Sequence, residues 1–190
     1  MGLRVVVVGI PGVGKTTVVE GVVSGLAGAK LVTFGTVMFD AARALRWARN
    51  RDEMRKMPVA RQKRLQMAAA AKIAKMRGKA VVVDTHLFIR TREGFWPGLP
   101  FDVVREMKPT HLVLVEASPE EIAKRRSSDG SRYRDVVTAE GLAEELQLAR
   151  SFLAVSSTLA GAPMMIVKNA EGRQAEAAQT VIGMLEDAQP

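Results

Sequence analysis

The stretch LRVVVVGIPGVGKTTVVEG, residues 3–21, constrains the fold more than any other part of the chain. A short apolar run ends in a glycine-rich turn, and the turn leads into a predicted helix. The residues from Gly9 to Thr16 match the pattern G-x-x-x-x-G-K-[ST], which marks a phosphate-binding loop when it lies between a strand and a helix. We therefore expect an α/β domain whose sheet includes this first strand.

The residue types of this loop suit the binding of an anion. Glycine lets backbone N–H groups converge on phosphate oxygens, and the following helix adds the partial positive charge of its amino terminus. Lys15 is predicted to reach the β- and γ-phosphates of a triphosphate, and Thr16 to offer its hydroxyl to Mg²⁺. The predicted triphosphate-binding residues are Gly9, Ile10, Pro11, Gly12, Val13, Gly14, Lys15, Thr16 and Thr17.

Short apolar runs alternate with amphipathic segments along the rest of the chain. Runs that are apolar on both faces favour parallel strands covered by helices on each side, and they lie at 5–9, 30–34, 79–84, 110–117 and 163–169. Helices are predicted at 15–27, 36–48, 52–77, 119–127, 138–159 and 172–187, with Ser118 and Thr138 at helix starts. The predicted fold class is α/β, with a three-layer parallel five-stranded sheet of the P-loop NTPase type.

Length and composition limit the class of protein. The chain has 190 residues and 47% hydrophobic content, which is enough for one domain with a substantial core. No run of about 18 apolar residues occurs and the amino terminus lacks the order of a signal peptide, so we expect a cytoplasmic location and no membrane segment. Cysteine is absent, which excludes disulfides and thiolate metal sites.

Positive charge is concentrated in one arm of the chain. The net charge is +8, and between Arg43 and Lys79 thirteen Lys and Arg residues stand against Asp52 and Glu53. Such a field attracts free nucleotides or a nucleic acid backbone, although a solvated helix face has the same composition. Aromatic residues that stack on bases are scarce, at 5% of the chain, which disfavours a nucleic acid as the partner.

Asp84 ends the predicted strand at 79–84. Open α/β sheets bind ligands at the carboxyl ends of their strands, and Mg²⁺ keeps several of its waters when it binds to proteins. We expect Asp84 to hold Mg²⁺ through water, with an aspartate that caps the next turn as the alternative. His86 fits a hydrogen-bonded loop histidine better than a substrate contact.

The segment KRRSSDGSRYRD, residues 124–135, is rich in arginine. We expect it to form a short polar connection between two helices that carries Arg125, Arg126, Arg132 and Arg134. Arginine is always charged and grips two phosphate oxygens at once, which is typical of a mobile lid that closes over phosphates and expels water. An exposed loop with incidental charge is the alternative. The guanine signature N-K-x-D is absent, which disfavours a GTPase and favours a small kinase.

The chain resembles the archaeal-type adenylate kinases over nearly its whole length. The resemblance rests on GIPGVGKTT at 9–17, NRDEMRKM at 50–57, RQKRLQ at 61–66, VVVDTHLFIRT at 81–91, GFWPGLP at 94–100 and the R-x6-R-x-R spacing of Arg125, Arg132 and Arg134. It implies Mg²⁺-dependent conversion of ATP and AMP into two ADP, and a homo-oligomer that is often a trimer. It also implies a core of residues 1–34, 78–123 and 137–190, a nucleotide-monophosphate arm of about 35–77 and a short lid of about 124–136.

Carried over position by position, the resemblance implies that the glycine loop holds ATP. Catalytic roles then fall to Lys15, Arg90, Arg125, Arg132 and Arg134. The region from Gly35 to Phe39, which includes Thr36, is expected against the acceptor adenosine. Bacterial members have the pattern G-D-M-L-R here, whereas this chain has Phe39 in place of the arginine. Another arginine must therefore grip the acceptor phosphate, with Arg90 as first candidate and Arg55 or Arg51 second.

Two features and two alternatives remain open from the residues alone. GFWPGLP is too irregular for a regular element, and it predicts either a rigid wall beside the acceptor or a surface turn packed on Trp96. Leu146 and Leu153 are predicted in the core. A kinase of another small acceptor, such as a pyrimidine monophosphate, shikimate or gluconate, would share the donor site. A nucleic-acid-binding ATPase would use the basic arm.

Overall fold

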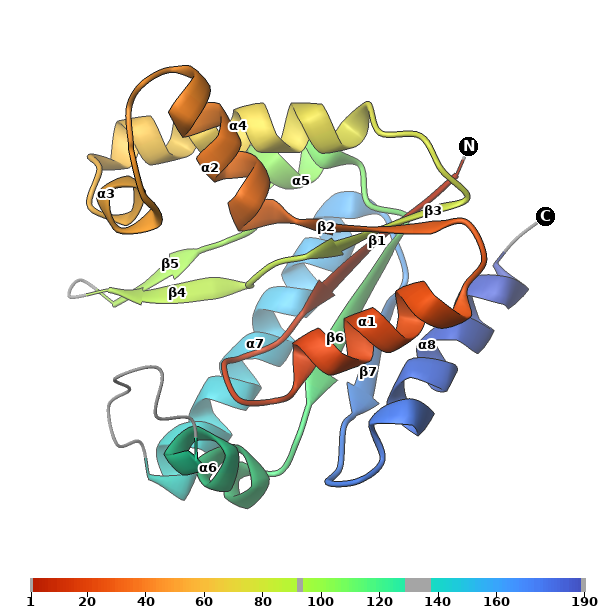
Figure 1. Cartoon of the computed structure of the whole chain (residues 1–190). Coiled ribbons are helices and arrows are strands. Elements are labelled where there is room, and N and C mark those ends of the chain that lie inside the picture. Colours follow the sequence, from red (N-terminus) through yellow and green to blue (C-terminus); the bar gives the residue numbers. More distant parts are fainter. Residues whose placement is uncertain (1, 92–93, 129–137, 189–190) are drawn as a thin grey trace.

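The computed structural model describes residues 2–91, 94–128 and 138–188, apart from the side chains of residues 90 and 91. In this part of the chain, five strands form one parallel sheet in the order β2-β3-β1-β6-β7, and two further strands form a hairpin. Helices lie on both faces of the sheet (Figure 1). The predicted α/β class, with a three-layer parallel five-stranded sheet, is confirmed.

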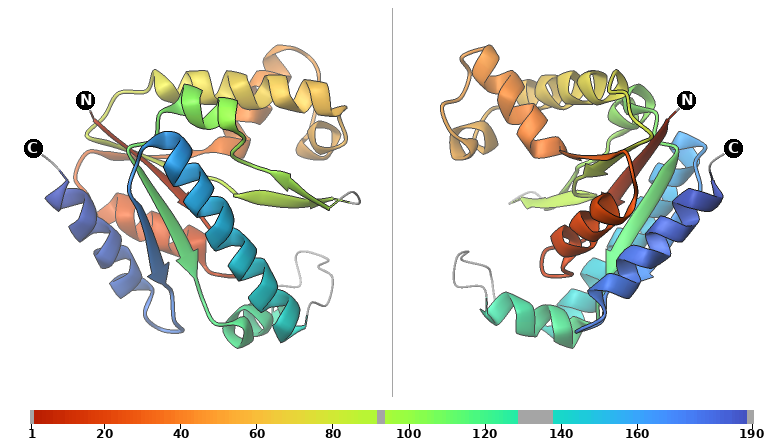
Figure 2. Two further views of the ribbon diagram at one scale, coloured as in Figure 1. Left: turned by 180° about the vertical axis from the view of Figure 1, so that it is seen from behind. Right: turned by 45° about the vertical axis from the view of Figure 1, so that its right-hand side comes forward.

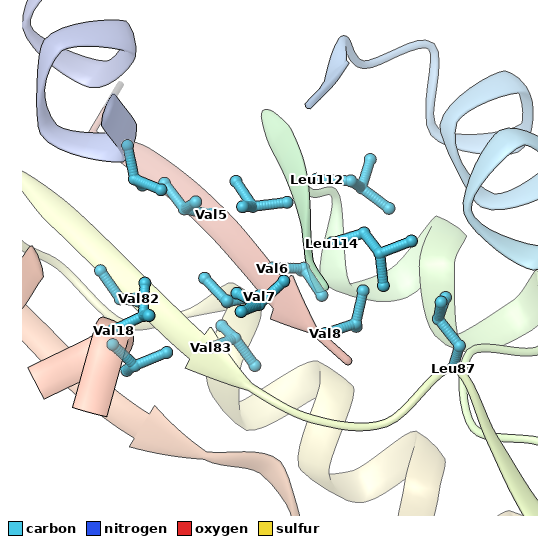
Figure 3. Packing of buried hydrophobic residues seen from close by; sticks show 14 of the residues in the cluster. Val5, Val6, Val7, Val8, Val18, Val82, Val83, Leu87, Leu112 and Leu114 are labelled. Carbon is cyan, nitrogen blue, oxygen red and sulfur yellow. The ribbon is translucent and has the colours of Figure 1, made fainter. Parts of the chain in front are cut away.

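The strands of the sheet match the predicted apolar runs within two residues. They are β1 (Leu3–Val8), β2 (Ala29–Thr33), β3 (Ala80–Asp84), β6 (His111–Glu116) and β7 (Met164–Lys168). The central strand β1 buries all four valines from Val5 to Val8, because β-branched side chains pack well on both faces of a covered sheet (Figure 3). The edge strand β7 instead leaves Met164 and Ile166 exposed.

Two pairs of helices sandwich the sheet. α1 (Lys15–Gly25) and α8 (Gln174–Asp187) pack together on one face, whereas α5 (Phe101–Met107) and α7 (Ala139–Ala160) contact each other on the opposite face (Figure 2). Leu146 and Leu153 of α7 are buried, as the sequence predicts. The short helix α5 is not among the sequence predictions.

Three helices form the basic arm, namely α2 (Phe34–Ala44), α3 (Arg51–Arg55) and α4 (Val59–Ala74). The prediction of one helix over 52–77 is wrong, because the chain leaves α3 and starts α4 around Pro58. Proline lacks a backbone N–H and disfavours the helical conformation in the residue before it. The arm has a small hydrophobic cluster of its own, made of Ala42, Ala48, Met54, Met57 and Leu65.

Residues 94–100 are more regular than the sequence predicts. β4 (Phe88–Thr91) and β5 (Gly94–Pro97) pair as an antiparallel hairpin, so the expectation of no regular element in GFWPGLP is wrong for its first four residues. The rings of Phe88 and Phe95 lie 4.9 Å apart across the hairpin. Such cross-strand contacts stabilise a strand pair, and they depend on a partner that the local pattern does not reveal.

Helix α6 (Pro119–Ser128) matches the predicted helix at 119–127 within one residue. Ser118 Oγ accepts a hydrogen bond from Glu121 N, and Ser118 N donates to Glu121 Oε2, which forms a capping box at the predicted start. Arg125 and Arg126 lie in the last turns of this helix, so the expectation of a polar connection over 124–135 is wrong for residues 124–128. Arg132 and Arg134 lie outside the described residues. Thr138 caps α7 by accepting a hydrogen bond from Gly141 N, as predicted.

Strand register places the ligand-binding edge. Asp84, the last residue of β3, pairs with Val7 of β1 and with Thr33 of β2. The glycine loop leaves β1 two residues after Val7, so Asp84 lies beside the start of the loop. Among the described residues, no helix combines the length and the apolar character needed to cross a membrane.

Candidate active site

The glycine loop between β1 and α1 has little space for larger side chains. Gly12 and Gly14 have positive φ angles of 94° and 78°, a backbone region that favours glycine. A Cβ atom on Gly14 would collide with the amide of Asn169, and one on Gly9 would lie 2.8 Å from the carbonyl oxygen of Val115. The predicted turn of glycines is therefore required both by conformation and by close packing.

Two backbone carbonyl groups of the loop accept hydrogen bonds from side chains that lie outside the loop. Val13 O accepts hydrogen bonds from Asn169 Nδ2 at 2.8 Å and from Arg125 Nη1 at 3.1 Å. Pro11 O accepts a hydrogen bond from Arg126 Nε at 2.8 Å. Because the N–H and C=O groups of a peptide plane point in opposite directions, donors that hold the carbonyls leave loop N–H groups available to an anion.

Lys15, the first residue of α1, forms an ion pair with Asp84 at the end of β3. The lysine side chain is 10% exposed and the aspartate side chain 19% exposed, so the pair lies largely away from solvent. Burial lowers the pKa of Lys15 to about 8, because removing water disfavours the charged ammonium. The ion pair with Asp84 holds the ammonium at the edge of the sheet.

The chemistry of Thr16 and Asp84 suits a magnesium ion. Thr16 is exposed in the first turn of α1 and offers a hydroxyl, and Asp84 offers a carboxylate. Both are oxygen ligands of the kind that Mg²⁺ prefers. Among the described residues, no three His, Asp or Glu side chains gather into a metal cage. The donor set therefore fits an ion that takes its other ligands from phosphate and water.

A cavity of about 190 Å³ lies between the basic arm and the β4–β5 hairpin, two parts that face each other in Figure 1. Asp84 lines this cavity and also forms the ion pair with Lys15, so the cavity begins beside the glycine loop. The residues that line it are Thr33, Phe34, Gly35, Met38, Arg51, Met54, Arg55, Gln62, Gln66, Asp84, Thr85, His86, Ile89, Trp96 and Gly98.

The cavity contains several of the residues predicted for the acceptor. Gly35 and Arg55 line it, and Thr36 accepts a hydrogen bond at 2.8 Å from Arg51, which also lines it. Phe39 is not among the described lining residues. It packs against the arm cluster instead, with the guanidinium of Arg43 6.0 Å from its ring centre.

The structure describes only some of the other arginines that are predicted for the site. Arg90 lies in β4 opposite Phe95, and its side chain lies outside the described part of the chain. Arg132 and Arg134 also lie outside it. Arg125 is placed at the glycine loop, where it contacts the backbone carbonyls of Val13 and Asn169.

Two residues near the loop are absent from the predicted site. Asn169 follows β7 and is fully buried, and Glu145 forms an ion pair of 3.1 Å with Arg126, one of the predicted lid arginines, in which both side chains are at most 12% exposed. One signal for Asn169 exists in the sequence, because a polar residue at the carboxyl end of a parallel strand marks the ligand-binding edge. The partnership of Arg126 with Glu145 has no such local signal, since the two lie on different helices.

Some known proteins are similar to this chain in sequence, and others are similar in fold alone. The family model described as "AAA domain" matches residues 8–143. An adenylate kinase of Methanoculleus marisnigri is 45% identical over 174 residues, covering 89% of this chain and 91% of the relative. Those of Thermoplasma acidophilum and Methanocaldococcus jannaschii are each 41% identical, and they cover 96% and 95% of this chain and 98% and 97% of the relatives.

Solved structures add a likeness of fold. A shikimate kinase from Bacteroides thetaiotaomicron has a TM-score of 0.59 at 15% identity and covers 97% of this chain and 98% of its own. A gluconokinase from Sinorhizobium meliloti has a TM-score of 0.57 at 15% identity, covering 98% of this chain and 93% of its own. At this identity the likeness supports the kinase fold and says nothing about the acceptor.

Proposed function

This chain belongs to the archaeal adenylate kinase family, and on that premise we propose that it transfers a phosphoryl group from Mg²⁺-bound ATP to AMP. It also belongs, through residues 8–143, to the AAA-domain family, and it is a nucleoside monophosphate kinase. The observation that carries the proposal is that Asp84 both pairs with Lys15 and lines the cavity under the arm. ATP bound in the glycine loop and AMP bound in the cavity would therefore place their phosphates next to each other beside Asp84.

The proposed reaction needs positioning and charge more than covalent help from the protein. An oxygen of the AMP phosphate forms a bond to the γ-phosphorus of ATP while the bond to the bridging β,γ-oxygen breaks, so both nucleotides leave as ADP. The N–H groups of the glycine loop hold the donor phosphates. Lys15 exchanges Asp84 for the phosphate oxygens and stabilises the charge of the transferred group.

Thr16 and Asp84 are the residues that would hold Mg²⁺. When bound, the ion neutralises charge on the β- and γ-phosphates of ATP. Asp84 would then act through water, which leaves Lys15 available to the phosphates. Removal of divalent ions with EDTA should therefore abolish turnover, and addition of Mg²⁺ should restore it.

Arginines supply the remaining positive charge in the proposed mechanism. Arg125 already lies at the glycine loop, and a rotation of its side chain brings the guanidinium to the donor phosphates. We assign the acceptor phosphate to Arg90, which lies six residues after Asp84 on the segment that leaves the sheet beside this carboxylate, with Arg55 or Arg51 of the cavity lining as second candidates. Arg132 and Arg134 remain assigned to the lid on the basis of their spacing from Arg125. A closed lid excludes water, which otherwise accepts the phosphoryl group.

A coupled assay of purified protein tests this function. The acceptors are AMP, GMP, CMP, UMP, shikimate and gluconate, each with ATP and Mg²⁺ and with a no-acceptor control. We expect saturable ADP formation with AMP and at most a few per cent of that rate with the others. ATP hydrolysis that is indifferent to AMP, or stimulated by RNA or DNA, would replace the kinase with the nucleic-acid-binding ATPase.

We also propose a homo-oligomer, a trimer according to the resemblance, in the cytoplasm. The support from the structure is an exposed apolar surface on two contacting elements, α7 with Val155 and Leu159 and the edge strand β7 with Met164 and Ile166. Exposed apolar patches and open strand edges are typical of interfaces. Size-exclusion chromatography with light scattering should give about three times the mass of 20.6 kDa, and a monomer would contradict this assembly.

A further inference from the structure

The cavity under the arm contains a buried amide group whose oxygen has no partner. Gln66 lies in α4, lines the cavity and is 6% exposed. In the described part of the chain, its Oε1 atom has no hydrogen-bond partner. A buried polar atom without a partner is unfavourable because it has given up its hydrogen bonds to water, so its presence in a cavity points to a ligand that satisfies it.

The glutamine one turn earlier shows the contrast. Gln62 also lines the cavity, but its Nε2 atom donates hydrogen bonds to the backbone carbonyls of Arg55 and Met57, at 3.0 and 2.9 Å. Gln62 therefore holds the connection between α3 and α4 together. Gln66 has no comparable task within the described protein, which leaves its amide for the contents of the cavity.

A second residue with an unpartnered polar group lies in the opposite wall of the same cavity. Trp96 of β5 lines the cavity, and its Nε1 atom is buried without a hydrogen-bond partner in the described part of the chain. Its ring lies 5.7 Å from the ammonium of Lys63 in α4, a cation–π contact that joins the hairpin to the arm. The two walls thus offer an amide and an N–H donor to one occupant.

We propose that Gln66 reads the base of the acceptor nucleotide, with its amide bonded to the 6-amino group and the neighbouring ring nitrogen of adenine. This inference rests on the proposed function, since it takes AMP as the occupant of the cavity. A glutamine amide offers an acceptor and a donor side by side, which matches an adjacent amino group and ring nitrogen on adenine. Trp96 Nε1–H supplies one further donor to a ring nitrogen of the base.

The ribose and phosphate then extend from the base toward the sheet. Asp84 lines the same cavity and contacts Lys15, so the phosphate lies where it can receive the transferred group. The three groups lie on different elements, Gln66 on the arm, Trp96 on the hairpin and Asp84 on the sheet. Binding of AMP therefore joins the arm to the core through hydrogen bonds that the free protein leaves unmade.

A pair of acceptors that differ in one amino group tests the assignment. AMP is compared with purine riboside 5′-monophosphate, which lacks the 6-amino group, in the wild-type enzyme and in Gln66→Met. For wild type we expect AMP to exceed the analogue about 10- to 100-fold in kcat/KM, because a polar site rejects a substrate that leaves its groups unpaired. For Gln66→Met we expect the ratio to fall to within about threefold of one, with the KM for ATP unchanged.

A charged variant provides a gain of function. In Gln66→Glu the side chain only accepts hydrogen bonds, and guanine offers two neighbouring donors, the ring N1–H and the 2-amino group. We expect the ratio of kcat/KM for GMP over AMP to rise at least about tenfold relative to wild type. Gln147→Met and Gln147→Glu, on the exposed side of α7, serve as controls that keep the wild-type ratios.

The outcomes separate this inference from the proposed function. If wild type fails to phosphorylate AMP, the proposed function is wrong and the inference falls with it. If wild type phosphorylates AMP and both Gln66 variants keep its AMP-to-analogue ratio, the base is read elsewhere and only the inference is overturned. If Gln66→Met does not fold, judged by thermal unfolding and ATP binding, Gln66→Asn replaces it. An unchanged ratio in that shortened amide would equally overturn the inference.

Discussion

Replacing Lys15 with methionine separates the two tasks that the structure gives this lysine. In the free protein the ammonium pairs with Asp84, and in the proposed mechanism it moves to the phosphates of ATP. Methionine keeps most of the length and the apolar stem but removes the charge. Lys15→Met should therefore lower both the turnover of the enzyme and the stability of the free protein.

The structure sets the size of each loss. Losing one preorganised donor to the transferred group raises the barrier by about 2.7–4 kcal/mol, and a full charge at this position brings the expected loss of kcat to about three orders of magnitude or more. Removing one partner of a buried ion pair costs about 3–5 kcal/mol. Because the side chain of Asp84 is 19% exposed, water can partly solvate the carboxylate that is left alone. We therefore expect the free energy of unfolding to fall by about 2–3 kcal/mol and the Tm by about 5–10 °C.

The assay measures kcat with saturating AMP and thermal unfolding without nucleotide, on the same preparations. The double variant Lys15→Met, Asp84→Asn provides the control for stability. With neither charge present, most of the lost Tm should return, whereas turnover should stay at the level of the single variant or below. This pattern would show that the change in stability comes from the loss of the ion pair with Asp84. It would also show that the change in kcat comes from the loss of the contact between Lys15 and the ATP phosphates.

Two results would refute this reasoning. A kcat within about tenfold of wild type would remove Lys15 from the donor site. If the double variant has the same Tm as Lys15→Met, or a lower one, Asp84 is not the ion-pair partner of Lys15 in solution.

Three further predictions concern residues around the two nucleotides. Asn169→Ala removes one donor to Val13 O and should raise the KM for ATP about fivefold to tenfold while the KM for AMP stays unchanged, as steady-state kinetics will show. Gly14→Ala places a side chain at a φ of 78° and against Asn169, so calorimetric titration should detect no ATP binding at concentrations that saturate wild type. Arg90→Ala should raise the KM for AMP or lower kcat without changing ATP binding, and an unchanged response to AMP would move that role to Arg51 or Arg55.

The fold and the donor loop followed from short stretches of sequence. The run from Val5 to Val8 predicts a strand buried on both faces, and its glycine loop predicts the chemistry of the following residues. Asp84 was predicted at the carboxyl end of its strand, and the structure places it beside Lys15. These predictions succeeded because strand burial, glycine conformation and helix starts depend on neighbours a few residues away.

The acceptor side was harder to predict from the residues. The break at Pro58 was missed because a strongly helical pattern lies on both sides of it, and the arm cluster stabilises the resulting turn. The β4–β5 hairpin was missed because each strand has only four residues and depends on its partner. The arm and this hairpin form the walls of the cavity, so the sequence indicated Gly35, Arg51, Arg55 and Asp84 but not most of the other lining residues.

By itself, the sequence determined the type of sheet, the phosphate-binding loop and the charges available for phosphoryl transfer. Only the tertiary structure decided which distant groups meet. Asn169 holds the carbonyl of Val13, 156 positions earlier, and Gln66 and Trp96 face one cavity from different elements. The physical reason is that a hydrogen bond or a cavity is a property of two or more surfaces brought together. Residue type and spacing along one segment specify only one of those surfaces.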